Sequence, residues 1–219
     1  MELKIISGVI LLSAAIFGFA LLVPDDASHK SQGLPWQIEK TADNNTRVFN
    51  ITLGKTTLQE AEKILLGDGE ISLFHAPDNS YSLEAYFDKV DIAGLTAKMI
   101  LVMDLPQEEL DKMYQRGVRI SKSGSGSNKV NIATPDLHRT REAPIASITY
   151  LPSINLKADQ IKAKFGEPKN RVIEPDTGVE HWLFPDIGLD IALDNNGKDV
   201  LQYVLPSSFA KISKPLNNL

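Results

Sequence analysis

The stretch Asn155–Glu174, NLKADQIKAKFGEPKNRVIE, decides how this chain is expected to fold. Asn155 is a residue type that favours the N-cap of a helix. The apolar residues that follow it have the i, i+3, i+7 spacing of one helix face: Ala158, Ile161 and Phe165. Gly166 ends the predicted helix, and Pro168 keeps it from resuming. The stretch therefore predicts a short amphipathic helix, followed by a strand that begins at Val172.

An earlier stretch, TTLQEAEKILLGDGEISLF at residues 56–74, repeats this pattern. Thr57 is followed by Glu60 at the spacing of a capping box, in which each side chain bonds the other residue's backbone N–H. Gly67 ends this helix. Its apolar residues precede the later triplet by one hundred positions each: Leu58, Ala61 and Leu65. The pattern of a helix, its C-terminal stop and the start of a strand therefore occurs twice in the sequence.

Short runs with strand character follow both helices, separated by turn residues. The predicted strands are Ile71–His75, Leu83–Val90, Ala97–Leu105, Lys129–Ala133, Pro144–Tyr150, Val179–Phe184, Gly188–Leu193 and Val200–Leu205. A further helix is predicted over Gln107–Gln115, after Pro106. Short turns between consecutive strands favour antiparallel meanders, and one polar face per strand is typical of such sheets.

These patterns predict an α+β fold: an N-terminal transmembrane helix followed by two tandem helix-on-antiparallel-sheet units. The expected organisation has five parts. They are a transmembrane signal anchor at 1–24, a linker at 25–47, a first unit with an extra helix and a flexible loop at 48–150, a second unit at 151–206, and a loose tail at 207–219.

The predicted anchor is an apolar run from Ile5 to Val23 that contains no charged residue. A helix of this length spans roughly 28 Å, close to the thickness of a bilayer core. Lys4 precedes it, so the positive-inside rule places the rest of the chain outside the cytoplasm. We expect a single-pass protein of the inner membrane with its C-terminal part in the periplasm or outside. The alternative is a signal peptide cleaved near Ala20 and a secreted product.

Composition excludes several classes of protein. The 219 residues contain no cysteine, which excludes disulfides, thiolate metal sites and a cysteine nucleophile. The net charge of −5 argues against nucleic acid as a partner, since nucleic-acid binding needs a concentrated basic face. The four histidines lie far apart in the sequence, which argues against a histidine-rich metal site.

The second unit resembles a known family. The features are a helix that ends in Phe165-Gly166-Glu167-Pro168, Trp182 at the opening of a strand, and an Asn195-Asn196-Gly197 turn in the last hairpin. Over residues 153–206 they resemble the small outer-membrane assembly lipoproteins of the SmpA/OmlA (BamE) type, and the tandem arrangement is similar to that of the β-lactamase-inhibitor proteins. The resemblance implies an exported protein that binds other proteins. The chain departs from those lipoproteins in lacking an anchoring cysteine and in having two units.

The candidate catalytic and metal-binding residues do not have the spacing or orientation that such sites need. His181 and Glu180 are neighbours on a strand and point to opposite faces, which indicates a surface histidine beside a core Trp182. Asp190 and Asp194 share a strand face but are about 13 Å apart, too far to chelate one ion. The tract Ser121–Asn128 lacks the spacing of a phosphate-binding loop, and no Gly-x-Ser-x-Gly elbow is present. We therefore predict no catalytic residue, no cofactor and no metal.

The leading interpretation is a membrane-anchored extracytoplasmic module that binds an envelope or membrane protein through a concave sheet surface and is not an enzyme. The residues expected to contact the partner are Tyr81, Tyr86, Trp182, Tyr203 and a basic loop cluster of His138, Arg139 and Arg141. For Trp182 a core position is the favoured alternative. Two other functions stay open: a secreted inhibitor of an exported enzyme, with Ser121–Asn128 as the inserted loop, and a hydrolase or glycan-binding protein.

Overall fold

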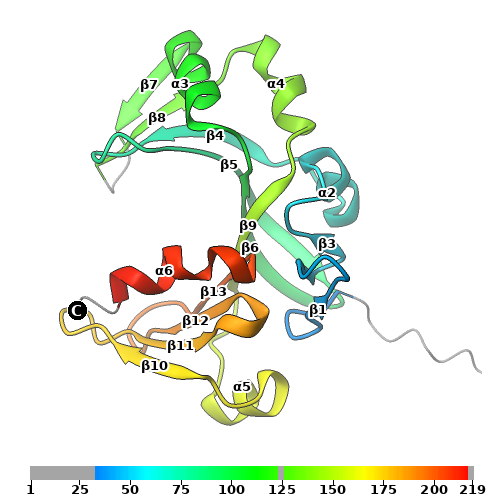
Figure 1. The fold of residues 1–219 in the computed structure, drawn as a ribbon, viewed down its shortest axis with the longest axis vertical. Helices are drawn as coiled ribbons and strands as arrows, with labels where there is room; N and C mark the ends of the chain where they lie inside the picture. Colours follow the sequence, from blue (N-terminus) through cyan, green and yellow to red (C-terminus); the bar gives the residue numbers. More distant parts are fainter. Residues whose placement is uncertain (1–32, 123–125, 217–219) are drawn as a thin grey trace, which may run out of the picture. The chain divides into compact units, whose positions relative to one another are not determined.

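The computed structural model describes residues 33–122 and 126–216, which form an α+β structure around one large antiparallel sheet (Figure 1). This confirms the predicted fold class at its coarse level. In these two ranges no helix is long and apolar enough to cross a membrane. The predicted anchor at 1–24 and the first part of the predicted linker lie outside the described residues.

The large sheet has ten strands, and each neighbouring pair is antiparallel. In spatial order they are β10 (Asn170–Ile173), β11 (Glu180–Phe184), β12 (Leu189–Leu193), β13 (Val200–Val204), β9 (Ile145–Pro152), β6 (Leu95–Met103), β5 (Tyr81–Ile92), β4 (Glu70–His75), β8 (Asn128–Asn131) and β7 (Arg119–Lys122). A small second sheet contains β1 (Glu39–Lys40), β2 (Thr46–Val48) and β3 (Ile51–Thr52).

The helices of the described ranges are short and connect or flank these strands. They are the α-helices α2 (Leu58–Leu65), α3 (Gln107–Arg116), α4 (Thr134–Arg141), α5 (Ala158–Phe165) and α6 (Phe209–Leu216), and the 3-10 turns η1 (Pro185–Ile187) and η2 (Pro206–Ser208). The extra helix predicted over Gln107–Gln115 is confirmed as α3. In Figure 1, α2 and the small sheet lie on one side of the central strands, and α6 lies on the other.

Alternation along the central strands gives the large sheet two different faces. Leu101 pairs with Ala85 on one side and with Ile148 on the other, and all three side chains are fully buried. These residues define the helix face, which α2 and α5 cover. Their neighbours in sequence point to the opposite side, which we call the open face. Among the helices of the described ranges only α6 packs on it, at its β11–β13 end, against Leu183 and Val204.

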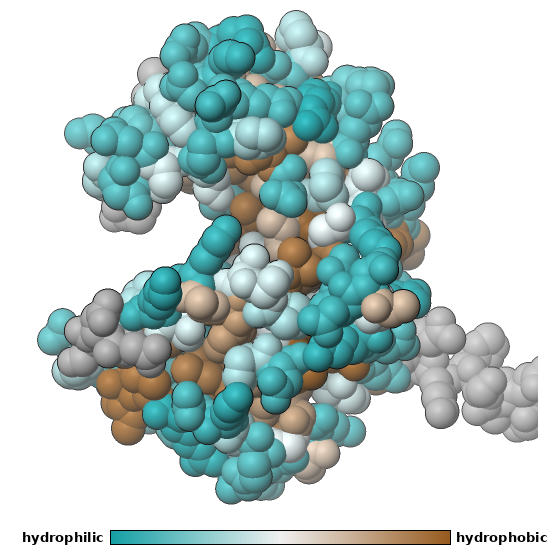
Figure 2. Space-filling model, viewed as in Figure 1, coloured by the Kyte–Doolittle hydropathy of each residue, from teal (hydrophilic) through white to brown (hydrophobic). Residues whose placement is uncertain are grey.

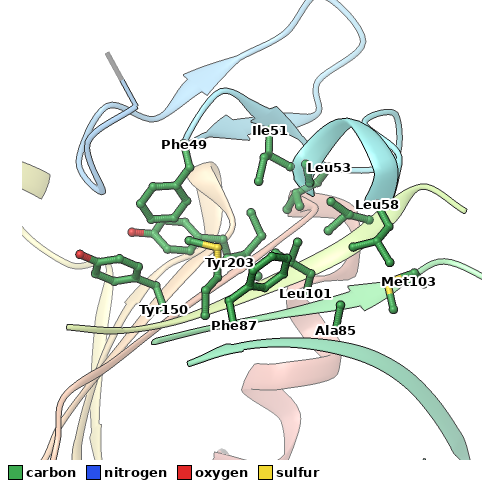
Figure 3. Close-up of a cluster of buried hydrophobic side chains, with 14 of the residues drawn as sticks. Phe49, Ile51, Leu53, Leu58, Ala85, Phe87, Leu101, Met103, Tyr150 and Tyr203 are labelled. Atoms are coloured by element: carbon green, nitrogen blue, oxygen red, sulfur yellow. The ribbon is translucent and has the colours of Figure 1, made fainter. Parts of the chain in front are cut away.

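The core of the helix face is rich in aromatic rings (Figure 3). Phe49 stacks on Tyr150 with ring centroids 5.0 Å apart and meets the edge of Tyr203 at 5.4 Å. Phe49 and Asn50 both have positive φ, 54° and 62°, in the tight turn between β2 and β3. This conformation costs a residue other than glycine about 1–2 kcal/mol, which burial of the Phe49 ring offsets.

The N-terminal part of the described chain is anchored in this core. The Tyr203 hydroxyl donates a buried hydrogen bond of 2.9 Å to the carbonyl oxygen of Pro35. The Thr46 hydroxyl, also buried, donates to the carbonyl oxygen of Ile187 at 3.0 Å. Residues 33–47, which were predicted to belong to a linker, are therefore part of the folded unit.

The helix α2 has the predicted capping box. Thr57 Oγ1 accepts from the Glu60 backbone N–H at 3.3 Å, and Glu60 Oε2 accepts from the Thr57 backbone N–H at 2.9 Å. The predicted end of this helix at Gly67 lies one residue after the observed C-cap. Leu66 is the C-cap, with φ of 55° and a side chain that is 92% exposed.

The helix α5 begins later than predicted. Its N-cap is Lys157 and not Asn155. The Asn155 side chain instead donates to the carbonyl oxygen of Gly197 at 3.0 Å and so ties the helix entrance to the β12–β13 turn. The predicted end at Gly166 is confirmed, with φ of 84°.

Two of the predicted boundaries differ from the structure. The expected junction between the units, at 150/151, falls inside β9, which is hydrogen-bonded to β6 on one side and β13 on the other. The tail after Pro206 was predicted to be loose, but residues 209–216 form α6. Its apolar positions 209, 212 and 216 have helical spacing and pack on Leu183 and Val204.

The hairpin of β7 and β8 lies between α3 and α4, and the sequence predicted only one of its two strands. Strand β8 agrees with the predicted run at Lys129–Ala133. Strand β7 was missed, because Ser121 and Lys122 belong to a tract that was predicted to be flexible. Residues 123–125 at the tip of this hairpin lie outside the described residues.

Candidate functional site

Away from α6, the open face is a sheet surface on which no helix of the described ranges packs. Its central side chains are half-buried and lie on three adjacent strands: Ser82, Glu84 and Tyr86 on β5, Ile100 and Val102 on β6, and Ser147 and Thr149 on β9. Figure 2 shows a hollow with hydrophobic side chains at its floor, at the level where these strands cross in Figure 1. An exposed strip of mixed aliphatic, aromatic and polar character suits a protein interface.

Glu84 lies at the centre of the open face. Its Oε1 accepts a hydrogen bond from the Ser82 hydroxyl at 2.9 Å, and no described cation lies within ion-pair distance of it. Burial raises the pKa of Glu84 above its usual value, and the bond from Ser82 opposes this shift. Cross-strand from it, Ser72 is 3% exposed, and its hydroxyl has no hydrogen-bond partner among the described atoms. The Glu84 carboxylate and the Ser72 hydroxyl thus lie where little water reaches them, and neither makes all the hydrogen bonds that it could make.

Tyr86, a predicted contact residue, lies on this face beside Glu84. Its hydroxyl donates to Asp88 at 2.8 Å, and Lys98 pairs with the same carboxylate at 2.9 Å. The ammonium of Lys98 is also 5.8 Å from the centroid of the Tyr86 ring. The hydrogen bond that Lys98 donates to Asp88 raises the pKa of Lys98, so this rim of the open face holds an ion pair.

Tyr81 lies on the helix face and not on the open face. Its ring stacks on His75 at 4.6 Å and contacts Tyr114 at 5.5 Å. Its hydroxyl donates to Asp111 on α3 at 2.7 Å, and this bond raises the pKa of Tyr81. The residue fastens α3 to the sheet, away from the open face.

The predictions for Trp182 and Tyr203 as contact residues are wrong, because both side chains are in the core. They are 1% and 0% exposed, respectively. The guanidinium of Arg171 covers the Trp182 ring at 3.9 Å, and the indole N–H has no hydrogen-bond partner in the described part of the chain. The alternative that the sequence favoured for Trp182, a core position, is the one observed.

The basic cluster is a helix and not a loop. His138, Arg139 and Arg141 lie on α4. Arg139 pairs with Glu109 at 2.8 Å, Arg141 with Glu62 at 3.3 Å, and the exposed His138 with Glu142 at 3.4 Å. These charges connect α4 to α3 and α2, so their first role is internal.

His181 forms a cluster that the sequence analysis missed. Its side chain is only 12% exposed, and its Nδ1 lies 2.8 Å from Asp190 Oδ2 while its Nε2 lies 3.2 Å from Glu174 Oε1. The hydrogen bond with Asp190 raises the pKa of His181, and Glu174 adds to the effect. The expected surface histidine is therefore a partly buried imidazole held between two carboxylates.

The register of the β11–β12 hairpin explains this cluster. His181 pairs with Ala192 and Leu183 pairs with Asp190, so histidine and aspartate are diagonal neighbours on one face. The other carboxylate oxygen of Asp190 is buried without a described partner. Over residues 33–122 and 126–216 no group of three or more metal-ligating side chains is close enough to hold an ion.

Comparison with known proteins identifies no relative. No protein-family model matches the chain. No curated protein matches it significantly. No solved structure does so either.

Proposed function

We propose that this chain is a membrane-anchored extracytoplasmic protein-interaction module whose partner docks on the open face. The observation that carries the proposal is Glu84, a half-buried carboxylate at the centre of an uncovered sheet surface with no described cation beside it. Such a group destabilises the folded chain on its own. A partner that supplies a cation would remove this penalty.

The surroundings of Glu84 define the chemistry of that partner. Ile100, Val102 and Tyr86 give it apolar neighbours, and Lys98 with Asp88 forms a charged rim. A lysine or arginine of the partner would reach Glu84, with apolar or aromatic side chains around it to exclude water. Removing one partner of such a desolvated charge pair costs about 2–5 kcal/mol of binding energy.

We also propose that the two halves are tandem copies of one helix-on-sheet unit, as the resemblance to the BamE-type and β-lactamase-inhibitor proteins implies. In support, α2 and α5 start and end one hundred residues apart, and each is followed by antiparallel strands. Both pack on the helix face, through Ala61 and Ile161. Doubling the unit widens the sheet and thereby creates the open face.

The membrane part of the proposal rests on the apolar run from Ile5 to Val23 behind Lys4. The described unit starts at Gly33, ten residues after this run in the sequence. Intact-mass analysis of the mature protein from the native host tests this part. Loss of roughly the first twenty residues would overturn the anchored form and favour a secreted inhibitor.

The docking proposal is tested with Glu84→Gln, which removes the charge and keeps the shape. Crosslinking and affinity purification from membranes should recover a specific partner with the natural chain and at least tenfold less with Glu84→Gln. The matched control is Glu108→Gln, at an exposed position on α3. Equal recovery with both variants would refute the role of Glu84, and no specific partner with the natural chain would refute the proposed function.

The same variant gives a second readout in the absence of a partner. The pKa of Glu84 is raised by folding, so its charged form lowers stability as the pH rises through that pKa. Glu84→Gln should therefore be at least as stable as the natural chain at pH 7 in urea unfolding. A marked loss of stability would instead mean that the carboxylate supports the fold.

A further inference from the structure

A cavity of about 430 Å³ lies on the helix face, between α5, the β5–β6 turn and the first described residues of the chain. Its walls are mainly apolar, and the principal residues are Trp36, Leu95, Tyr150, Ile161, Phe165 and Leu201. Its size falls within the range of about 300–1,000 Å³ that is typical of ligand pockets. The cavity is separate from the open face, because Tyr150 and Leu201 belong to the other side of the sheet.

The Tyr150 side chain provides a hydroxyl donor at this cavity. The residue is 2% exposed, its ring is fixed against Phe49, and its hydroxyl has no hydrogen bond to any described residue. Figure 3 shows this oxygen directed away from the packed side chains of the cluster. Burial raises the pKa of Tyr150 to about 12, so the group remains a phenol that donates at neutral pH. The hydroxyl lines the cavity without a described hydrogen-bond partner, so it can donate to an acceptor oxygen of a ligand there.

Lys164 supplies the charge of the cavity. It lies in the last turn of α5, and its ammonium is 4.6 Å from the centroid of the Trp36 ring. No carboxylate of the described ranges lies within ion-pair distance of it. The charge of Asp91, at the end of β5, raises the pKa of the Tyr150 phenol and opposes negative charge beside it, so one ligand charge, offset by Lys164, is favoured over several. The cavity therefore combines apolar walls with the Tyr150 hydroxyl and with the ammonium of Lys164, which has no described carboxylate partner.

We propose that this cavity binds a hydrophobic monocarboxylate, with its chain among the apolar walls and its carboxylate between the Tyr150 hydroxyl and Lys164. Benzene fills an apolar cavity of about 150 Å³, or about 25 Å³ for each carbon atom. On that scale the cavity of about 430 Å³ holds roughly 17 non-hydrogen atoms, which corresponds to a fatty acid of about fifteen carbons including its carboxylate. This site is independent of the proposed protein interface.

The test uses the full-length chain in nanodiscs, with empty nanodiscs as the blank for partition into lipid. Decanoate, dodecanoate, tetradecanoate, hexadecanoate and octadecanoate are titrated while tryptophan emission is followed, because Trp36 lines the cavity. Affinity should rise about fourfold for each added methylene and level off near about fifteen carbons, where the cavity is full. Affinity that keeps rising with chain length at the same slope would indicate partition only and overturn the proposal.

Two variants identify the polar contacts. Tyr150→Phe should weaken dodecanoate binding about tenfold or more, since a hydrogen bond to a charged group is lost, while stability in urea is unchanged because the hydroxyl has no partner in the free chain. Lys164→Met, at an exposed position that does not threaten the fold, should weaken dodecanoate binding about tenfold and leave dodecanol binding unchanged. Lys162→Met on the same helix is the matched control.

The outcomes are distinct. Loss of affinity in the two site variants and not in the control supports the site, whereas equal affinity in all three overturns it. A lysophospholipid with a twelve-carbon chain distinguishes the source of the ligand. Tighter binding of the lysophospholipid than of dodecanoate assigns the cavity to a membrane lipid, and the reverse assigns it to a free fatty acid.

Discussion

Replacing Tyr203 with Phe removes one buried hydrogen bond that closes a long loop of the chain. The ring and its contact with Phe49 are kept, and only the hydroxyl that donates to the Pro35 carbonyl at 2.9 Å is lost. Tyr203 is fully buried, so the carbonyl is left unpaired inside the protein. Such a loss costs about 1–3 kcal/mol. For a unit of this size, about 2 kcal/mol lowers Tm by about 4–8 °C.

Urea unfolding followed by far-UV circular dichroism measures this loss as a lower midpoint at an unchanged slope. Amide hydrogen exchange should also become faster over residues 36–50, because the segment is no longer held from Tyr203. The control is Tyr86→Phe, since its hydroxyl bonds the exposed Asp88 and should contribute no more than about 0.5 kcal/mol. If both variants unfold at the same urea concentration as the natural chain, the Pro35 carbonyl is solvated and the N-terminal segment is not docked as described.

Two further predictions concern the charge cluster and the core. The carboxylates of Asp190 and Glu174 raise the pKa of His181, so the stability it contributes is fully present below its ordinary pKa of about 6.5 and is lost as the pH rises through the folded value. His181→Gln should therefore lower the unfolding free energy more at pH 6 than at pH 9, and an equal loss at both would contradict the linkage. Leu101→Ala, at a fully buried position of β6, should cost about 2–5 kcal/mol in urea unfolding, while Ile173→Ala, at a side chain 63% exposed on an edge strand, should cost below about 0.5 kcal/mol.

The elements that the sequence predicted are those determined by residues close together along the chain. The capping box of Thr57 and Glu60 and the glycine stop at Gly166 act within a few residues, so their effect can be derived without the fold. The α6 stripe was just as local, but Phe209 and Leu216 are surrounded by lysine, serine and asparagine, which hid the helical spacing.

The functional surfaces could not be predicted in this way, because they depend on register. Glu84 gains its significance only when β6 and β4 pair on either side of β5. His181 and Asp190 meet only through the β11–β12 pairing, and neither residue alone indicates the other. An amphipathic aromatic such as Tyr203 fits a core and an interface equally well, so the sequence could not place it.

Because β9 lies in the middle of the sheet, its two neighbouring strands become available for pairing at different times during synthesis. Its partner on one side, β6, is made before it, whereas its partner on the other, β13, follows about fifty residues later. Until residues 200–204 emerge, the first half of the protein presents a long strand edge with unpaired backbone groups, a surface that favours pairing with other chains. A nascent chain that stalls before β13 would therefore expose an aggregation-prone edge, and the emergence of Val200–Val204 would be the event that closes it.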